Sequence, residues 1–302
     1  MNGDCIKFGW EIRQSARYRK VIEQFIMQIE PNYKTFFTHY QDTVHQIDTD
    51  IRFWKHFLTN SINRYKEDNP TNKWIHQSGF SIYDISPDGL TSWLHSSSKI
   101  LTIEIDDLAD QNNKFFVWVM NVAIIRIYNS LELLLLQTIQ VKYFPLLDNP
   151  IKGKKFANKI IFEIKNYLKA QSLNTETVNN RHIIVFLKAN SVLCKQFLEV
   201  PVNHVNWKTN WGNFYEMLSI LRNIITHDGM IITKSTHNTI KSITADIFAH
   251  FFEPITGKES LETLQVKNEE YFLNFVNLIN DLAGNLLKIV AEEPNLNFIG
   301  LQ

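Results

Sequence analysis

Three polar residues near the end of one amphipathic segment could do chemistry together: Arg222, Asn223 and His227, in "LRNIITHDG". We call them the Arg-Asn-His motif. Arginine carries a permanent charge and a planar fork of donors that suits phosphate, and asparagine both donates and accepts hydrogen bonds. Histidine can hold or release a proton near neutral pH. A phosphodiester lying along this motif would meet an anion clamp and a proton-transfer group together.

The spacing predicts a helix over residues 211–228 that positions the motif. At about 100° per residue, Asn223, His227 and Glu216 fall together within roughly 40°, while Arg222 lies about 140° from His227. Arg222 thus borders the apolar side of the helix. That side is predicted to be buried and consists of Phe214, Met217, Leu218, Leu221, Ile224 and Ile225. Gly229 follows, as is common just past a helix end, because glycine accepts a positive φ.

The motif also has a plain structural interpretation. A cationic side chain in the last helical turn complements the helix dipole without having any function. In a chain with 10 histidines, one such Arg-to-His spacing is expected by chance. The spacing alone therefore does not define a site.

The stretch "LRNIITHDG" resembles the signature of the HEPN superfamily, in which Arg, a polar residue, three further residues and His end an amphipathic helix. Arg222, Asn223 and His227 match that signature position for position. The upstream "YNSLELLLL" resembles the first long helix of such domains, which often carries a Glu; here that residue is Glu132. The resemblance covers about residues 112–292, but only the nine-residue motif is specific.

The resemblance implies an all-α bundle, often a homodimer in which two motifs face each other, and in many members a metal-independent endoribonuclease. His227 would take the proton from a ribose 2′-OH, and Arg222 would stabilise the charge on the attacked phosphate. Asn223 would orient the phosphate or the histidine ring, and a second His227 would protonate the leaving 5′-oxygen. The products would be a 2′,3′-cyclic phosphate and a 5′-OH end, and DNA would be inert.

Glu216 and Glu132 are possible accessory residues, although a solvated surface role is the simpler interpretation for Glu216. Two other functions remain open. The chain could be a catalytically silent HEPN-type module that binds RNA, a nucleotide or a partner protein, or a helical scaffold in which the motif only caps a helix. As a nuclease, it would be a toxin or antiviral-defence effector with a possible antitoxin or defence partner.

A second candidate RNA-binding surface is the lysine-rich stretch "IKGKKFANKIIFEIKNYLK" (151–169). Its candidate phosphate ligands are Lys152, Lys154, Lys155 and Lys159. Such contacts would give a salt-dependent affinity. The alternative is a solvated helix face whose apolar residues pack inward.

Composition restricts the partners and the compartment. The 302 residues balance 31 basic against 31 acidic side chains, so bulk charge does not indicate nucleic-acid binding. The two cysteines show no pairing or metal-binding pattern, and the N-terminus lacks the apolar core of a signal peptide. Polar residues interrupt the most apolar stretch (117–136) at helical intervals, so we expect a buried helix. We expect a cytoplasmic protein that uses no metal, cofactor or membrane.

Helical periodicity over most of the chain, with only 10 Gly and 8 Pro, predicts an all-α helical bundle with an N-terminal helical extension. The expected helices span residues 14–29, 34–66, 112–142, 154–171, 179–199, 211–228, 236–252 and 268–292. Residues 65–89 are predicted to be a loop or linker, with a turn at "SPDG" (86–89). A small β-hairpin is possible within 251–266. We divide the chain into an N-terminal helical region (1–105) of unknown role and a HEPN-like helical domain (106–302).

Overall fold

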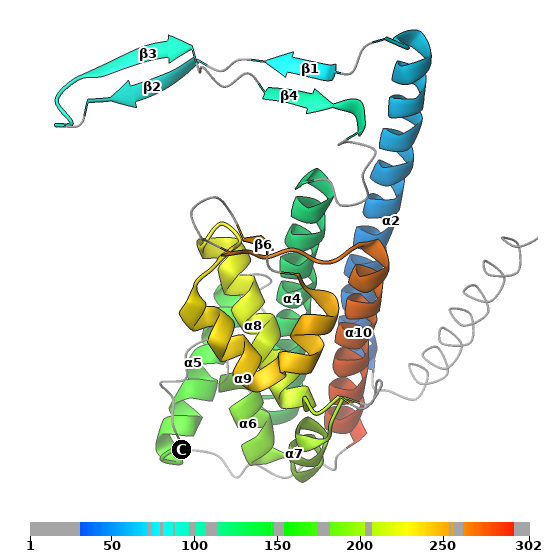
Figure 1. The fold of residues 1–302 in the computed structure, drawn as a ribbon. Coiled ribbons are helices and arrows are strands. Elements are labelled where there is room, and N and C mark those ends of the chain that lie inside the picture. Colours follow the sequence, from blue (N-terminus) through cyan, green and yellow to red (C-terminus); the bar gives the residue numbers. More distant parts are fainter. Residues whose placement is uncertain are drawn as a thin grey trace, which may run out of the picture.

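The computed structural model describes residues 31–292 apart from 72–73, 79–80, 87, 97–100, 107–113, 146, 148–153, 174–181, 203–206, 254 and 257–261. These residues form a helical bundle (Figure 1), which confirms the predicted fold class. Its eight described helices are α2 (Pro31–Asp68), α4 (Lys114–Tyr143), α5 (Lys154–Ala170), α6 (His182–Asn190), α7 (Val192–Glu199), α8 (Trp211–His227), α9 (Lys234–Phe251) and α10 (Glu269–Glu292). The expected helix over 14–29 lies outside the described residues.

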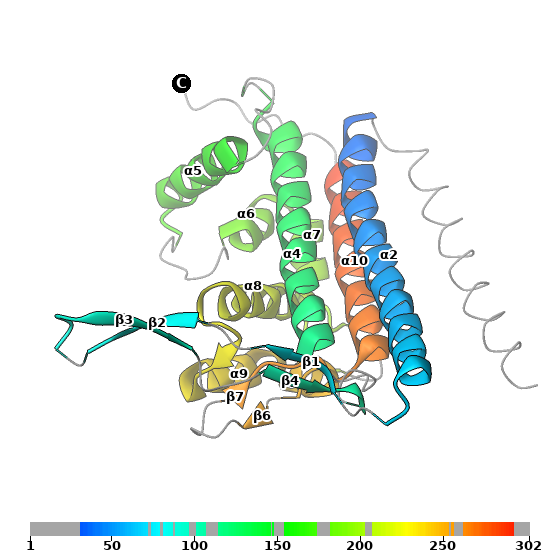
Figure 2. The ribbon, with the colours of Figure 1, turned by 90° about the horizontal axis from the view of Figure 1, so that it is seen from above.

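The three longest helices form one layer. Helices α2, α10 and α4 lie side by side, and α5, α6, α8 and α9 lie on the other side of α4 (Figure 2). Residues from both layers join one hydrophobic core, to which α2 contributes Tyr33, Phe37 and Tyr40. The segment Phe116–Tyr143 of α4 is long and apolar enough to cross a membrane, but 56% of the window that qualifies is buried inside the fold. Such burial fits the core helix of a soluble protein.

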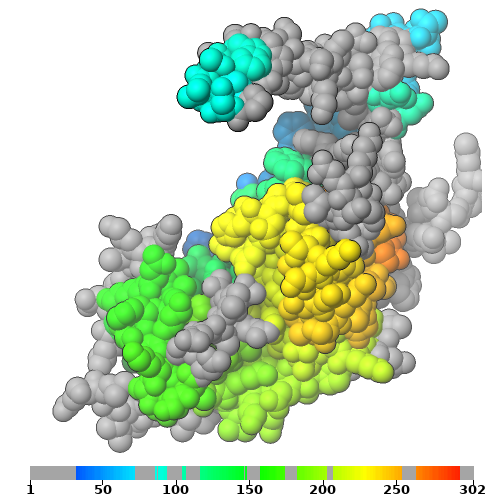
Figure 3. Space-filling model, turned by 60° about the vertical axis from the view of Figure 1, so that its left-hand side comes forward, coloured from blue at the N-terminus to red at the C-terminus, as the bar shows by residue number. Residues whose placement is uncertain are grey.

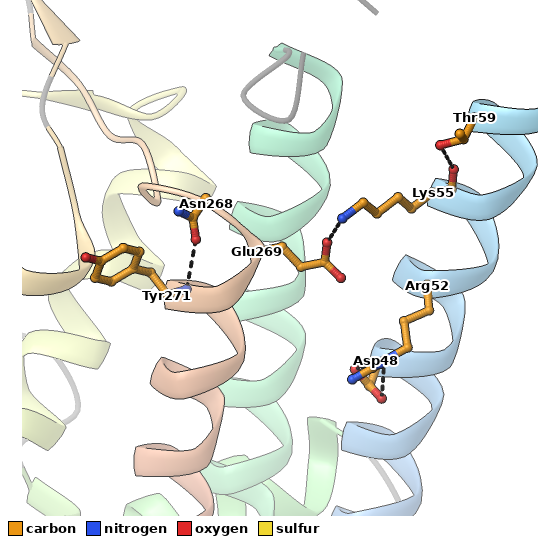
Figure 4. A network of polar contacts seen from close by, with 7 residues as sticks. All are labelled: Asp48, Arg52, Lys55, Thr59, Asn268, Glu269 and Tyr271. Carbon is orange, nitrogen blue, oxygen red and sulfur yellow. Dashed lines mark hydrogen bonds and ion pairs between the residues drawn. The ribbon is translucent and has the colours of Figure 1, made fainter. Parts of the chain in front are cut away.

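Contacts between side chains fix α2 against α10. Tyr40 Oη donates to Asn280 Oδ1 at 2.7 Å, and Lys55 forms an ion pair with Glu269 at the first residue of α10 (Figure 4). Asn268 Oδ1 accepts a hydrogen bond from the Tyr271 backbone N–H at 3.1 Å and so caps α10. The earlier residue of α2, Tyr40, meets the later residue of α10, Asn280, and the later residue of α2, Lys55, meets Glu269. The two helices therefore run antiparallel.

Side chains with short polar groups cap the start of three other helices. Ser191, Asn210 and Thr233 precede α7, α8 and α9, and each accepts a hydrogen bond from a backbone N–H in the first turn. This is the arrangement that satisfies donors left free at a helix N-terminus. The sequence therefore sets where α8, which carries the Arg-Asn-His motif, begins.

The predicted hairpin within 251–266 is confirmed. Strand β6 (Ile255–Thr256) pairs antiparallel with β7 (Glu262–Thr263), and β7 also pairs with β5 (Ile231–Ile232), which directly follows α8. The resulting sheet has the order β5-β7-β6. The hairpin thus fixes the position of β5, the segment that follows the Arg-Asn-His motif.

The prediction of a loop over residues 65–89 was wrong in part. Strands β1 (Trp74–Ser78) and β2 (Ser81–Ile85) lie within it, and they pair with β4 (Leu101–Glu104) and β3 (Ser92–Ser96) in an arm that extends from the end of α2 (Figure 1). Turn-forming residues between the short strands obscured their alternation. The predicted turn is present: the Gly89 N–H donates to Ser86 O at 2.8 Å, and Gly89 has a φ of +72°.

His182, at the start of α6, is buried, and its Nε2 has no hydrogen-bond partner among the described residues. Burial, together with the nearby charge of Lys165, lowers the pKa of His182 from 6.5 to about 4. The folded protein therefore holds this ring neutral at pH values at which the unfolded chain protonates it. The stability that the neutral ring supplies is present above pH 6.5 and is lost as the pH falls toward 4.

Replacing His182 by Leu should make the protein more resistant to acid. Between pH 7.5 and pH 5, the free energy of unfolding of His182→Leu should gain about 2 kcal/mol relative to the wild type, since 1.5 pH units below the unfolded pKa correspond to that energy. Urea unfolding at the two pH values measures the change. An equal difference at both values would contradict the buried neutral histidine.

Candidate functional site

Helix α8 buries the side that its sequence predicts. All six of the predicted apolar residues are buried, and Tyr215 on the neighbouring side is fully buried as well. Its hydroxyl lies 3.5 Å from that of Tyr128 on α4. Burial, with Tyr128 and Glu132 nearby, raises the pKa of Tyr215 well above its usual value. The buried face therefore locks the rotation of α8 and determines which residues of the motif reach the surface.

The turn after α8 reverses the chain sharply. Gly229 and Met230 both have positive φ values, of 58° and 70°. The Met230 N–H donates to Ile224 O at 3.2 Å, and the Asp228 N–H donates to the same oxygen at 3.1 Å. The prediction that Gly229 ends the helix is confirmed. Met230 is less expected, because a side chain at positive φ is strained.

Asn121 of α4 secures that turn. Its Nδ2 donates to Met230 Sδ at 3.2 Å and to Leu264 O at 3.1 Å, and the Leu264 N–H donates to Met230 O at 2.8 Å. Asn121 is fully buried. Sequence reasoning missed this role and treated Asn121 only as an interruption of an apolar stretch. The earlier residue of α4, Asn121, contacts Met230 after the end of α8, and the later residue, Tyr128, contacts Tyr215 near its start. The two helices therefore run antiparallel.

The motif lies at the exposed end of α8. His227 is exposed, whereas Arg222 and Asn223 are half-buried. Arg222 Nη1 donates to Asn223 Oδ1 at 3.0 Å, so Asn223 orients the guanidinium. His227 lies one turn beyond Asn223 on the same side of the helix. The three side chains therefore lie around the C-terminal end of α8. Arg222 is fixed by Asn223, and the imidazole of His227 is open to solvent.

Apart from Asn223, Arg222 has no matched acceptor in the part of the chain that the structure describes. Its Nε is buried and has no hydrogen-bond partner among the described residues, and no described carboxylate forms an ion pair with it. Guanidinium donors withdrawn from water are costly unless they are paired. An anion at this position would supply the missing acceptor, which is the property expected of a phosphate-binding arginine.

The structure does not bring the two accessory glutamates to the motif end. Glu216 is half-buried and precedes His227 by three turns, about 16 Å along the axis at 1.5 Å per residue. Glu132 lies beside Tyr215, two turns before Arg222. Because α4 and α8 are antiparallel, the chain continues from Glu132 away from His227. Glu132 therefore lies with the buried tyrosine pair and away from His227.

The lysine-rich candidates are placed only in part. Lys159 is exposed on α5, and the apolar residues Ile160, Ile164 and Leu168 pack inward. Lys152 and the side chains of Lys154 and Lys155 lie outside the described residues. The end of α8 and the start of α9 (yellow) reach the surface on the same face of the molecule as α5 (green) in Figure 3.

The residues before α8 are tied to α9. Asp246 accepts hydrogen bonds from the backbone N–H of Lys208 at 2.5 Å and of Thr209 at 3.2 Å, and from the Thr209 hydroxyl. Asn213 Nδ2 donates to Ile243 O at 3.2 Å, next to the kink in α9 at Thr244. Asp246 therefore serves as an anchor for the loop.

No group of three His, Cys, Asp or Glu suited to a metal occurs in the described part of the chain.

Comparisons with protein-family models, with curated proteins and with solved structures found no match for this chain. The case for a site therefore depends on the motif and its surroundings.

Replacing Asn121 by Ala should destabilise the protein by about 1–3 kcal/mol, because the substitution leaves Leu264 O buried without a partner. Asn129→Ala, at an exposed position of the same helix, serves as the control and should change stability by less than about 0.5 kcal/mol. Urea unfolding compares the two variants. Similar losses for both would mean that Asn121 does not secure the turn.

Proposed function

We propose that this protein is a metal-independent endoribonuclease of the HEPN type, and that it acts as a toxin or antiviral-defence effector in the cytoplasm. The observation that carries the proposal is the arrangement at the end of α8. A half-buried arginine, with no ion pair to any described carboxylate, is held by Asn223. It lies little more than one turn before an exposed histidine. The match of all three residues to the HEPN signature gives this arrangement its chemical interpretation.

The reaction follows from the side chains. His227 accepts the proton of a ribose 2′-OH, and the 2′-oxygen attacks the adjacent phosphorus. Arg222 binds the non-bridging oxygens and stabilises the added charge of the pentavalent state. Asn223 keeps the guanidinium in position through the hydrogen bond to Nη1. The bond to the 5′-oxygen breaks, and the products are a 2′,3′-cyclic phosphate and a 5′-OH end.

A second copy of the chain would supply the acid for the leaving oxygen. His227 cannot act as both base and acid on opposite sides of one phosphorus in a single step, so a partner's histidine completes the site. Exposed apolar side chains on α4 support such a partner: Trp118, Val122 and Leu133. At 100° per residue these three side chains fall within about 60° of one another. This arc of α4 lies between the side that meets α8, marked by Asn121 and Tyr128, and the side that meets α2, marked by Arg126.

The alternative function is a catalytically silent module that binds RNA, a nucleotide or a partner protein. Arg222 supports this function as much as it supports catalysis, because a guanidinium with no described carboxylate partner can bind phosphate whether or not a bond is cut. An antitoxin or defence partner could also occupy this edge. Measuring cleavage separately from binding distinguishes the two functions.

Wild-type protein incubated with total RNA in EDTA should release fragments with 2′,3′-cyclic phosphate ends. Arg222→Ala and His227→Ala should each lower the rate by at least about 100-fold, the usual contribution of a general base or of an oxyanion donor. His45→Ala, an exposed histidine on α2, is the control and should cut like the wild type. Binding of RNA without cleavage by the wild type would instead favour the silent module.

Charged substitutions on α4 should separate the two copies. The double variant Val122→Glu/Leu133→Glu should sediment as a 35.5 kDa chain, whereas the wild type should sediment at twice that mass. The control is Val192→Glu/Leu193→Glu, which places the same charges on exposed residues of α7. A monomeric wild type, or a dimeric α4 variant, would exclude this face as the interface.

A further inference from the structure

Trp118, in the first turns of α4, exposes much of a large aromatic ring to solvent. Its exposed fraction is 51%, although an indole gains a great deal of free energy from leaving water. A single exposed apolar side chain needs no function. The position of this ring relative to the Arg-Asn-His motif therefore decides how it is interpreted.

Trp118 lies at the same level as the motif along the axes of two packed helices. Helices α4 and α8 are in contact and antiparallel, and Tyr128 meets Tyr215 between them. At 1.5 Å per residue, Trp118 lies about 15 Å from Tyr128 toward the start of α4. Asn223 and His227 lie about 12 and 18 Å from Tyr215 toward the end of α8, which is the same direction. The indole therefore falls between the levels of Asn223 and His227.

Trp118 and Asn223 also lie on the same face of the pair formed by α4 and α8. At 100° per residue, Asn223 is displaced by about 80° from Tyr215, and Trp118 by about 80° from Tyr128 in the same rotational sense. In two antiparallel right-handed helices, equal displacements in the same sense from a shared contact lead to the same face. Because the axes of packed helices lie about 8–10 Å apart, the exposed indole borders the motif.

The residues around this corner suit a nucleotide. Helix α4 carries no ionisable residue over residues 116–125, and α8 carries only Arg222 and His227 over residues 217–227. The next residue, Asp228, is acidic and exposed. The corner thus combines an aromatic face with a guanidinium and an imidazole. Proteins that hold single-stranded nucleic acid combine aromatic rings for the bases with cations for the phosphates in this way.

We propose that Trp118 stacks the base of the nucleotide whose phosphate Arg222 binds. The inference rests on the proposed function, since it takes RNA to be bound at the motif, and it adds the residue that holds the base. A base reaches the indole only when it is unpaired and unstacked from its neighbours. Because every base has an aromatic face, Trp118 binds RNA without a strong sequence preference.

Trp118 also belongs to the exposed apolar side chains of α4 that we propose to meet a second copy. It lies at the end of that strip nearest the motif, about 6 Å beyond Val122 and about 22 Å beyond Leu133 along the axis. The indole therefore borders the shared site, where the bound base and the second copy meet. A test of stacking must accordingly follow the oligomeric state as well as the affinity for RNA.

The His227→Ala protein allows binding to be measured apart from cleavage. Its affinity for a fluorescently labelled single-stranded RNA should fall about 5- to 150-fold when Trp118→Ala is added, the usual effect of removing a stacking ring. Trp118→Phe should retain most of the affinity, because it keeps an aromatic face. Trp54→Ala is the matched control, since Trp54 on α2 is 52% exposed, and it should bind like the parent.

A second strand, with abasic nucleotides in place of the bases, separates stacking from other effects. The His227→Ala proteins with and without Trp118→Ala should bind this strand equally. Equal affinity for the intact RNA, or an equally large loss with the abasic strand, would overturn the assignment of Trp118. A loss of affinity that accompanies a halved sedimenting mass would assign Trp118 to the dimer contact instead, and would also overturn it.

The same measurements distinguish this inference from the nuclease reaction. If the wild type binds RNA without cutting it, the nuclease reaction is excluded while the stacking result stands. If the His227→Ala protein binds neither strand, the proposed function and the role of Trp118 both fail.

Discussion

The burial of α4 determines the rest of the structure. This helix contacts α2, α5, α8 and α10, so most of its circumference is apolar, and Leu131, Leu135 and Ile139 are among its fully buried residues. The free energy gained by removing such side chains from water is what holds the two layers together. A helix enclosed in this way also has a fixed rotation. The packing of its apolar side chains therefore also fixes the direction of its few polar ones. The buried leucines that follow Asn121 hold that residue against the turn after α8.

The strain at the end of α8 and the support given by Asn121 belong together. Met230 occupies a backbone region that a residue with a side chain avoids, and a buried amide from α4 binds both its sulfur and the strand opposite. Strained backbone persists where the surroundings determine it completely. The result is a helix that ends abruptly, with the last turn exposed and the preceding turn half-buried. Arg222 and His227 lie on the two sides of that boundary.

Much of this could be predicted from the sequence, because the signals were local. The sequence predicted the helical periodicity of α8, its buried face and the glycine after it. It also predicted the small hairpin that ends at β7. The strands β1–β4 were not, since Ser, Asn and Pro among them also indicate loops. Nor could the sequence assign Asn121 its partners, which lie 109 and 143 residues away. That Arg222 has no carboxylate partner among the described residues is likewise a property of the folded surroundings, and the sequence carries no signal for it.

The arm formed by β2 and β3 differs from the bundle in kind. Its two strands pair with each other over five residue pairs, and the ribbon projects beyond the helices (Figure 1). A two-stranded ribbon is only marginally stable alone, so its opening should leave the helical core intact. Its tip, with Asp88, Gly89 and Leu90 exposed, is consequently the natural place to insert an affinity tag or a fluorescent label, since exposed loop tips tolerate insertions best.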